Sequence, residues 1–477
     1  MWTNEVGLSQ MRANPWMAAS AIIVATLLGI IVPLHVSLFD SNFALILALP
    51  LLVVVGLIFT YDRMVLLVAI LLLRAGAELF LNAGRTAYGG AGSVLNLCVI
   101  LIALLAVIDK PGLLSRRVLF MWAGFYLSAL VGVLMAPERL SAARSYLTLV
   151  SNLAVFLSAF HYAKDRKGFD QVVWIIVGSS LLPALYAFVD LALYRHVPGF
   201  RLRSTFSHPN VAAFYFNLII TLCFYLLKSS ITRLTGVARA AMYLYLLLIL
   251  GLLALTQTRS AWIACILFFA AYGLLFERRF LIYLIIGISC ALMLPVVHER
   301  LLDLASGNHV SRNAQQLNSF AWRLLLWKSA LNWMQPDHYL FGYGLGGFRF
   351  HTNEFFPLAG GIHWDAHNVY MEWFFDVGLV GVITYFWVHV QGLRGVWHLY
   401  GTDRLAAFSV GFAILGYLIV SASDNMLSYL VFNWYFWFLV GAACSLAVST
   451  LQGSPGRWRT PADTRVTSYK DGVSSAI

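Results

Sequence analysis

Apolar runs of about 20 residues recur from one end of this chain to the other, and each is long enough to cross a lipid bilayer as a helix. Of the 477 residues, 60% are hydrophobic and only 11% are charged. A soluble domain is usually about half apolar and about a quarter charged. The composition therefore excludes an ordinary soluble enzyme, a disordered protein and a disulfide scaffold. It predicts an all-α, polytopic transmembrane helix bundle.

The hydropathy pattern predicts about 12 to 14 membrane-spanning helices. Fourteen apolar segments lie near 17–38, 43–60, 64–81, 94–108, 117–136, 143–163, 171–194, 210–229, 238–256, 259–276, 279–297, 367–393, 404–422 and 427–449. The 64–81 segment is weak because it contains Arg74 and Glu78, and the 94–108 segment is weak because it is short. Arg74 and Glu78 are spaced i,i+4, so we expect them to form a structural ion pair.

The basic residues predict the orientation of the bundle. If the segments alternate from a cytoplasmic N-terminus, most of the 32 lysines and arginines fall in short cytoplasmic pieces, as the positive-inside rule requires. Both termini are therefore expected in the cytoplasm. The net charge of +11 then sets topology, and we expect no nucleic-acid partner. The five cysteines lie inside apolar runs without CxxC partners, so we expect no disulfide or metal role for them.

The same map divides the chain into five regions. We expect N-terminal transmembrane helices over 1–200, transmembrane helices with external arginine motifs over 201–297, a long external loop over 298–366, C-terminal transmembrane helices over 367–450 and a disordered cytoplasmic tail over 451–477. Within the loop, residues 317–334 are amphipathic and predict a helix lying in the membrane interface. The glycine-rich stretch 341–348 predicts a turn.

Polar side chains at the external face are the candidates for function, because placing a polar group near a bilayer costs free energy and such groups usually have a function. The first group is RLRSTFSHPN at 201–210, which holds Arg201, Arg203 and His208. Asn210 can cap the helix that begins there. Guanidinium groups beside a helix N-terminus suit a phosphate or pyrophosphate. The alternative is a loop whose arginines contact lipid phosphates.

The second group is TQTRSAW at 256–262, where two apolar helices meet with almost no connecting loop. Arg259 is the only charge in this hairpin. It could bind the same anion as Arg201 or Arg203, or it could anchor the turn at the membrane surface.

The third group opens the helix after the long loop, within HWDAHNVYMEWFFDVGLVG at 363–381. His367 and Asn368 lie at the helix start, and Glu372 lies about one turn further on. A histidine in this position can accept a proton near neutral pH, as a general base must. The alternative is a histidine that only orders the start of the helix.

Four further polar residues lie on the external side. Arg323 and Lys328 belong to the 317–334 helix, where substrate contact and a solvated or lipid-facing role are both open. Asp424 and Asn425 in the last external hairpin are out of place in an apolar region.

Three histidines and an aspartate in the 351–367 stretch could suggest a metal site. They are His351, His363, Asp365 and His367. Their spacing matches no standard zinc pattern, so we expect no metal.

Taken in order, these motifs resemble those of the bacterial O-antigen ligase family. Its signature is His, then Asn, Ser or Gln, nine residues, and Gly-x-x-Gly, which corresponds here to His367, Asn368, Gly378 and Gly381. The upstream pattern of arginine, phenylalanine and Pro-Asn is similar to Arg201, Phe206, Pro209 and Asn210, with Ser204 where relatives often have glycine and Arg203 as an additional base. The hairpin pattern resembles Gln257-Thr258-Arg259-Ser260, and an arginine–tryptophan helix before a G-x-G turn resembles Arg323, Trp327, Gly342 and Gly344.

The resemblance implies a reaction and a location. Such a ligase transfers a preassembled glycan from undecaprenyl pyrophosphate to lipid A-core at the periplasmic face of the bacterial inner membrane, without metal or other cofactor. His367 would be the base, and Arg201 or Arg203 would hold the pyrophosphate together with Arg259. His208, Asn210, Asn368, Arg323 and Glu372 are expected to contact substrate. We therefore expect guanidinium groups from two hairpins and the imidazole of His367 to share one pocket just outside the bilayer.

Other functions remain open on the sequence. An O-antigen polymerase uses the same donor but a second lipid-linked glycan as acceptor, and the motifs do not distinguish it. A protein O-oligosaccharyltransferase often has a longer C-terminal region than this chain. A lipid-linked oligosaccharide flippase or other transporter would place charges through the membrane midplane, whereas the polar groups here gather at one face.

Overall fold

The computed structural model describes residues 62–83, 91–232, 234–293, 295–302 and 319–452, together with Phe59. The segments predicted at 17–38 and 43–60, and the tail from 453 onwards, lie outside these residues. Every regular element in the described part of the chain is a helix, which confirms the all-α class. Nine helical stretches among the described residues, one of them made of two consecutive helices, are long and apolar enough to cross a membrane, so the chain is a multi-pass membrane protein.

The helices follow one another with short connections. They are α3 (Arg63–Arg74), α4 (Glu78–Ala83), α5 (Ala91–Asp109), α6 (Arg116–Met135), α7 (Arg139–Tyr162), α8 (Arg166–Ser179), α9 (Leu181–Tyr194), α10 (Pro209–Lys228), α11 (Gly236–Leu255), α12 (Arg259–Leu275), α13 (Phe280–Leu292), α14 (Pro295–Leu302), α15 (Ser319–Trp333), α16 (Gly347–Phe355), α17 (Val369–Trp397), α18 (Arg404–Ser421) and α19 (Leu430–Gln452). Short 3₁₀ turns lie at Pro111–Leu114, Pro336–His338, His398–Gly401 and Met426–Ser428.

One predicted segment, 64–81, is broken into the short helices α3 and α4 by a turn after Arg74. Side chains from distant parts of the chain form hydrogen bonds with the backbone groups that the break exposes. The Tyr435 hydroxyl accepts a hydrogen bond from Ala75 N at 3.1 Å, and Thr205 Oγ1 donates to Ala75 O at 2.7 Å. Arg74 and Glu78 form the expected ion pair across the break. Tertiary contacts therefore stabilise an interruption that hydropathy alone does not locate.

A second predicted segment, 171–194, belongs to a longer apolar stretch that starts at Arg166 and divides into α8 and α9 at Ser180. Pro183 follows three residues later and has no N–H to donate into the preceding turn. The Ser180 hydroxyl is bound instead to Val177 O and to the Tyr245 hydroxyl, both at 2.6 Å.

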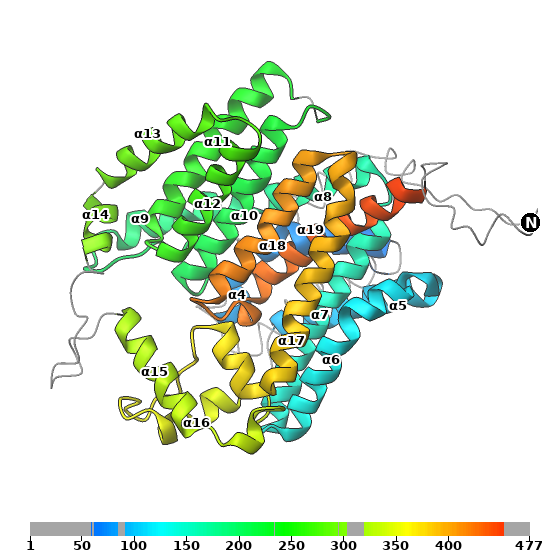
Figure 1. Cartoon of the computed structure of the whole chain (residues 1–477). Coiled ribbons are helices and arrows are strands. Elements are labelled where there is room, and N and C mark those ends of the chain that lie inside the picture. The colour runs from blue at the N-terminus through cyan, green and yellow to red at the C-terminus, as the bar shows by residue number, and fades with distance from the viewer. Residues whose placement is uncertain are drawn as a thin grey trace, which may run out of the picture.

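Helices α10 and α19 form the centre of the bundle, surrounded by the others (Figure 1). In the apolar part of each of these two helices, 94% of the residues are buried within the protein, compared with 17% of the residues in the apolar part of α5. The outer helices expose large apolar side chains, such as Leu127 on α6 (63% exposed), Leu185 on α9 (65%) and Leu244 on α11 (69%). Helices that are apolar on every face belong in a protein core or in lipid, so these outward faces are suited to contact with acyl chains.

Polar residues gather at the two opposite ends of the bundle. At one end, Arg166 is bonded to Asp403, and Lys228 Nζ lies 2.8 Å from Glu277. At the other end, the segments around 201–210, 256–258, 366–368 and 423–429 contact one another. This grouping agrees with the predicted alternation of the segments.

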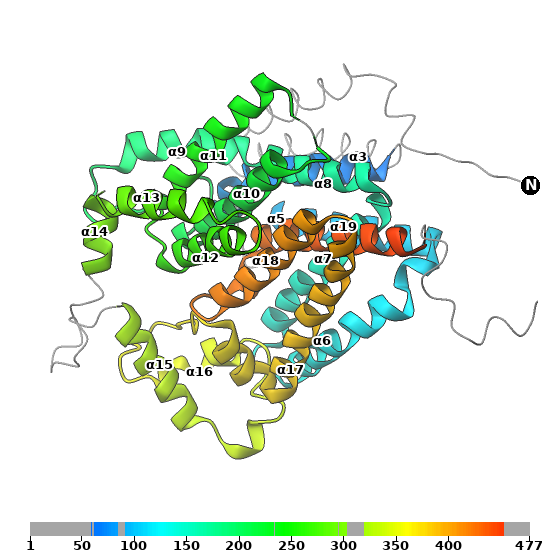
Figure 2. The ribbon, with the colours of Figure 1, turned by 45° about the horizontal axis from the view of Figure 1, so that its top comes forward.

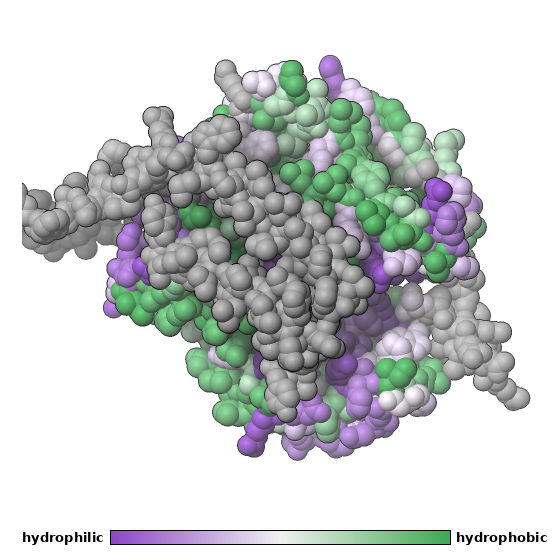
Figure 3. Space-filling view, turned by 180° about the vertical axis from the view of Figure 1, so that it is seen from behind, coloured by the Kyte–Doolittle hydropathy of each residue, from purple (hydrophilic) through white to green (hydrophobic). Residues whose placement is uncertain are grey.

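The long loop contains a small domain of its own. Helices α15 and α16 lie beyond the ends of the bundle, beside the first turns of α17 (Figures 1 and 2). They share a second hydrophobic core that includes Leu326, Ala330, Phe348 and Phe375. Helix α15 confirms the helix predicted at 317–334, while its place in the membrane interface stays a prediction. Figure 3 shows many hydrophilic residues at the bottom of the picture, the end of the molecule at which α15 and α16 are drawn in Figure 1.

The predicted glycine-rich turn is confirmed, and it lies directly against α17. Gly342 and Gly344 have φ values of +73° and +92°, which only glycine adopts at little cost. Gly378 interrupts α17 with a φ of +72°, and a Cβ there would lie 2.3 Å from the backbone of Leu340. The Leu379 N–H donates to Tyr339 O at 2.8 Å. Gly378, the first glycine of the Gly-x-x-Gly signature, therefore permits close contact between α17 and this turn.

Candidate active site

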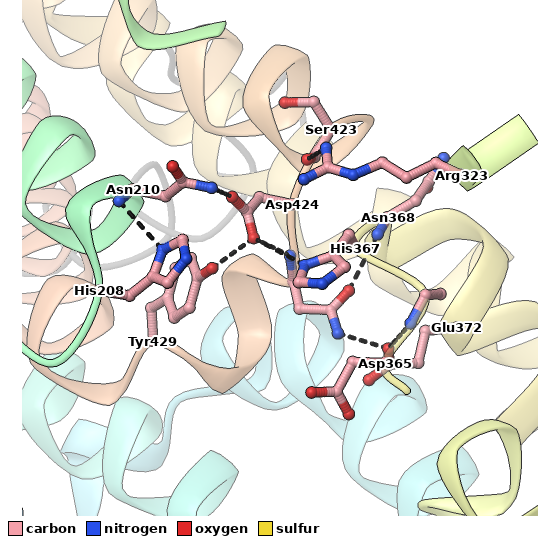
Figure 4. A network of polar contacts seen from close by, with 12 residues as sticks. His208, Asn210, Arg323, Asp365, His367, Asn368, Glu372, Ser423, Asp424 and Tyr429 are labelled. Carbon is pink, nitrogen blue, oxygen red and sulfur yellow. Dashed lines mark hydrogen bonds and ion pairs between the residues drawn. The ribbon is translucent and has the colours of Figure 1, made fainter. Parts of the chain in front are cut away.

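Asp424 lies at the centre of a polar network (Figure 4). The network is at the end of the bundle that lies next to the long loop. The Asp424 side chain is completely buried. The Asn210 amide and the Tyr429 hydroxyl donate hydrogen bonds to its two carboxylate oxygens. His367 Nδ1 lies 3.8 Å from Asp424 Oδ1. One buried carboxylate thus joins the start of α10, the start of α19 and the residue that precedes the cap of α17.

The surroundings of Asp424 keep it ionised. Burial alone would raise its pKa, but the interaction with His367, the hydrogen bond from Tyr429 and the positive charge of Arg323 outweigh burial and hold the pKa below the ordinary value of 3.8. A carboxylate facing Nδ1 of an imidazole favours the tautomer with the proton on Nδ1, so that Nε2 keeps its lone pair. His367 is 29% exposed and can therefore meet a substrate.

The backbone around His367 is held in a strained conformation. Its φ is +50°, a left-handed value that is uncommon for a residue other than glycine. On the C-terminal side, Asn368 N donates to Asn425 Oδ1 at 2.9 Å, and on the N-terminal side, Ala366 N donates to Glu372 Oε2 at 3.0 Å. The Asn425 amide in turn donates to Glu372. The Glu372–Asn425 pair therefore holds both sides of the His367 backbone.

Asn368 begins α17 as its N-cap. Its side-chain oxygen accepts hydrogen bonds from the N–H groups of Tyr370 and Met371 at 2.9 and 3.2 Å. An asparagine cap satisfies donors that the first turn of a helix leaves open. The predicted helix start at 367–368 is confirmed.

Arg201 lies across the network from His367. Its guanidinium group donates to Thr256 O at 3.0 Å, to Asn210 Oδ1 at 2.8 Å and to Thr258 Oγ1 at 3.0 Å. Because Asn210 also donates to Asp424, a chain of two hydrogen bonds connects Arg201 to the carboxylate beside His367. The 201–210 segment, the 256–258 hairpin and the His367 loop therefore meet at one place.

Several cations crowd around Arg201. Burial, followed by the charge of Arg300, lowers its pKa to about 10, and Arg259 and Arg323 add to this effect while Asp424 opposes it. At neutral pH all of these arginines are charged. Such a group of partly buried cations favours binding of a multivalent anion.

Arg259 and Arg323 reach this group from other elements. Arg259 begins α12, and its guanidinium donates to Arg300 O at 3.3 Å and to Ser319 Oγ at 3.2 Å. Arg323, on α15, donates to Ser423 O at 2.7 Å, next to Asp424. Arg259 thus lies beside the network rather than bonded to Asn210 or Asp424 by any contact in the described residues.

His208, and not Asn210, caps α10. His208 Nδ1 accepts a hydrogen bond from Asn210 N at 3.1 Å, and the helix begins at Pro209. Burial lowers the pKa of His208, so it is neutral at pH 7 and able to accept this bond. The predicted cap role of Asn210 is wrong because its side chain is occupied by Arg201 and Asp424 inside the first turn.

Arg203 faces a different element. Its Nε lies 3.9 Å from Asp190 Oδ1, and its guanidinium lies over the Tyr194 ring at 5.4 Å. The buried Asp190 also accepts the N–H groups of Arg203 and Ser204 at 3.0 and 2.9 Å. Of the two candidate arginines in this segment, Arg201 is the one in the network, and a substrate role for Arg203 stays a prediction.

The loop histidines have separate partners. His351 Nδ1 lies 2.9 Å from Glu354, His363 Nδ1 lies 3.0 Å from Arg349 O, and His367 faces Asp424. Among the described residues, no group of three or more His, Cys, Asp or Glu side chains is placed to hold a metal ion.

The sequence predicts that seven of the candidate residues lie at this end of the molecule, and the structure places all seven in or beside the network. They are Arg201, His208, Asn210, Arg323, His367, Asn368 and Glu372. The sequence assigned no role to Asp424, Asn425 or Tyr429. The Asp-Asn pair in an apolar hairpin was the available signal, because a buried carboxylate near a membrane needs partners.

Comparison with known proteins finds a similarity in part of the chain that forms this site. A family model described as O-antigen ligase matches residues 244–386, which run from α11 into α17 and include Arg259, Arg323 and His367. A search of curated proteins found no match. Residues 244–386 are therefore similar to the O-antigen ligase family, in the part of the chain that carries Arg259, Arg323 and His367.

Proposed function

We propose that the protein is an O-antigen ligase of the bacterial inner membrane. It transfers a preassembled glycan from undecaprenyl pyrophosphate to lipid A-core at the periplasmic face, in lipopolysaccharide biosynthesis. One observation carries the proposal: the hydrogen bonds from Arg201 through Asn210 to Asp424 place a cationic group and the His367 imidazole in one site. An anion-binding group beside a base is what transfer from a pyrophosphate to a hydroxyl requires.

The reaction is a single displacement. The acceptor hydroxyl oxygen attacks the anomeric carbon of the donor glycan, a new C–O bond forms, and the bond to the pyrophosphate oxygen breaks. Undecaprenyl pyrophosphate leaves with the electron pair. His367 Nε2 takes the hydroxyl proton and later returns it to water. Attack opposite the leaving group inverts the anomeric configuration.

Each side chain then has a defined task. Asp424 keeps the His367 proton on Nδ1 and stabilises the imidazolium, and positioned bases of this kind contribute about 10²–10⁴-fold to a rate. Arg201, with Arg259 and Arg323, stabilises the charge that develops on the departing pyrophosphate. Pyrophosphate is already a good leaving group, so the site needs no strong general acid.

The distribution of charge supports a periplasmic site. The end of the bundle opposite His367 bears short basic segments, including Arg116, Arg117, Lys164 and Lys167. Under the positive-inside rule that end faces the cytoplasm. The network at the other end then faces the periplasm, close to the level of lipid head groups.

Transfer by the purified full-length protein tests the proposal. The assay combines undecaprenyl-pyrophosphate-linked glycan with rough lipopolysaccharide in the presence of a chelator, and the product is analysed by mass spectrometry and by the configuration of the new linkage. Glycan joined to lipid A-core with inverted configuration is the expected result. Glycan joined only to a second undecaprenyl-linked glycan would identify a polymerase, and transport of the donor without transfer would contradict an enzymatic role.

A further inference from the structure

A large cavity adjoins the His367 loop, and neither Arg201 nor Arg323 lines it. Its volume is about 840 Å³, and the described residues around it come from α5, α7, the glycine-rich turn with α16, the start of α17 and the 425–430 segment. Asp365 and Val369, which lie two residues before and after His367, line it. The cavity is therefore a second space that borders the His367 loop.

The polar wall of the cavity offers hydrogen-bond partners of the kind that sugar hydroxyls use. Ser141, Ser145 and Thr148 present hydroxyl groups from α7, and Asn96 presents an amide from α5. Ser141 and Ser145 are exposed. Hydroxyl and amide groups can both donate and accept, which matches a polyhydroxylated ligand better than a lipid chain.

Aromatic rings complete the wall. Trp373 on α17 and Phe350 on α16 line the cavity beside these polar groups. A few oriented polar groups among apolar and aromatic side chains are typical of a small-molecule site. A sugar ring has an apolar face and a polar edge, so it fits a wall of this mixed kind.

The charges of the cavity differ from those around Arg201. Arg144 and Arg349 line it, but so do four acidic residues, Glu138, Asp365, Glu372 and Asp376. Arg349 Nη1 lies 3.5 Å from Asp365. Positive and negative groups are therefore mixed, and Arg74 on its border is paired with Glu78. Such a space does not favour a phosphorylated ligand over an uncharged one, in contrast to the arginine group on the other side of His367.

The two spaces are joined through the groups that hold His367. Glu372 and Asn425 line the cavity, and the same two side chains bind the backbone N–H groups of Ala366 and Asn368. A molecule bound in the cavity thus lies against the segment that fixes the imidazole. A hydroxyl at its end would approach His367 from the side opposite the arginines.

We infer that this cavity binds the terminal saccharide of the acceptor, that the sugars it takes are uncharged, and that it presents their hydroxyl to His367. The inference rests on the proposed function, because it assigns the acceptor to one side of the site and the pyrophosphate to the other. Donor and acceptor then bind in separate spaces and meet only at the imidazole.

Blocking the cavity tests the assignment. Ser145→Trp adds a large side chain at an exposed position of α7, where folding should be unaffected. Leu140→Trp, at a residue that is 69% exposed on the same helix and does not line the cavity, is the matched control. We expect Ser145→Trp to raise the acceptor KM at least 10-fold, with the donor KM within 2-fold of wild type and the control unchanged. An unchanged acceptor KM, or a rise confined to the donor KM, would overturn the assignment.

A binding measurement separates this inference from the proposed function. In Ser145→Cys protein without donor, rough lipopolysaccharide with uncharged terminal sugars should slow maleimide labelling of position 145 at least 5-fold, and labelling of Leu140→Cys should not change. The same acceptor bearing a phosphate on its terminal sugar should protect less. Protection without transfer in the donor assay would reject the proposed function and keep the cavity assignment, whereas transfer without protection would reject the cavity. Equal protection by both acceptors would reject the preference for uncharged sugars.

Discussion

Asn210 and Asp424 lie 214 positions apart in the chain, and the Asn210 amide donates a hydrogen bond to the Asp424 carboxylate. Arg201 binds the other end of the same amide at 2.8 Å, and Asp424 faces His367. The contact therefore connects the cationic half of the site to its base. In chemical terms, it sets the position of the leaving group relative to the group that accepts the proton.

Asp424→Asn should lower kcat about 100-fold or more while leaving both KM values within about 3-fold. An amide cannot hold the imidazole in the required tautomer or stabilise its charged form, and a comparable substitution in serine proteases costs about 10⁴-fold. Steady-state transfer assays measure the effect. Asp337→Asn, at a side chain that is 76% exposed in the same external domain, should behave as wild type. A normal kcat for Asp424→Asn would exclude a positioning role.

Arg201→Lys should raise the donor KM and lower kcat, with a combined loss in kcat/KM of about 10- to 100-fold. Lysine keeps the charge but cannot make the three directed hydrogen bonds to Thr256, Thr258 and Asn210. Arg195→Lys, on the exposed part of the same connection, is the matched control. If Arg201→Lys bound donor and turned over normally, a bulk positive charge at this place would suffice and the directed role would be wrong.

The contribution of Asp424 to stability should depend on pH in the acid range. Its pKa is lower in the folded protein than the ordinary value of 3.8, so its ionised form stabilises the fold above about pH 4 and this stabilisation is lost as the pH falls through the lower folded value. The difference in Tm between wild type and Asp424→Asn should shrink as the pH falls below about pH 4. Thermal unfolding in detergent at each pH measures it. A difference that grew as the pH fell below about pH 4 would contradict an ionised, partnered Asp424.

Gly378→Ala should destabilise the protein by more than about 2 kcal/mol, because a side chain is strained at a φ of +72° and its Cβ would lie 2.3 Å from the backbone of Leu340. Gly251→Ala in α11, where nothing lies within 4 Å of the added carbon, should be neutral or stabilising by about 0.5–1 kcal/mol. Denaturation of the two variants side by side gives the comparison. Equal stability would mean that the turn at 339–344 can move away from α17.

The sequence predicts the side of the membrane on which a polar residue lies, because each apolar segment crosses the membrane once and successive segments run in opposite directions. That reasoning brought Arg201, Arg259 and His367 to the same face. It does not predict which helices are neighbours within the bundle, because contacts such as Asn210–Asp424 depend on lateral packing of segments that are equally apolar.

The residues to which the sequence assigned no role show the same limit. Asp424 and Asn425 act on the site mainly through partners more than 50 positions away, namely His367, Asn368 and Glu372. Glu372 was expected to contact substrate, and its two hydrogen bonds now assign it to holding the His367 backbone as well. The break in the 64–81 segment likewise depends on Tyr435 and Thr205, which no local pattern reveals.

The central claim is that His367 accepts the acceptor proton at a site where the donor is already bound by arginines. Single-turnover transfer by purified His367→Ala, measured with its affinity for undecaprenyl pyrophosphate and its Tm, tests it most directly, and His196→Ala at an exposed position serves as control. The account predicts a loss of transfer of at least about 10³-fold with donor affinity and Tm close to wild type. Transfer within a few fold of wild type would contradict the account.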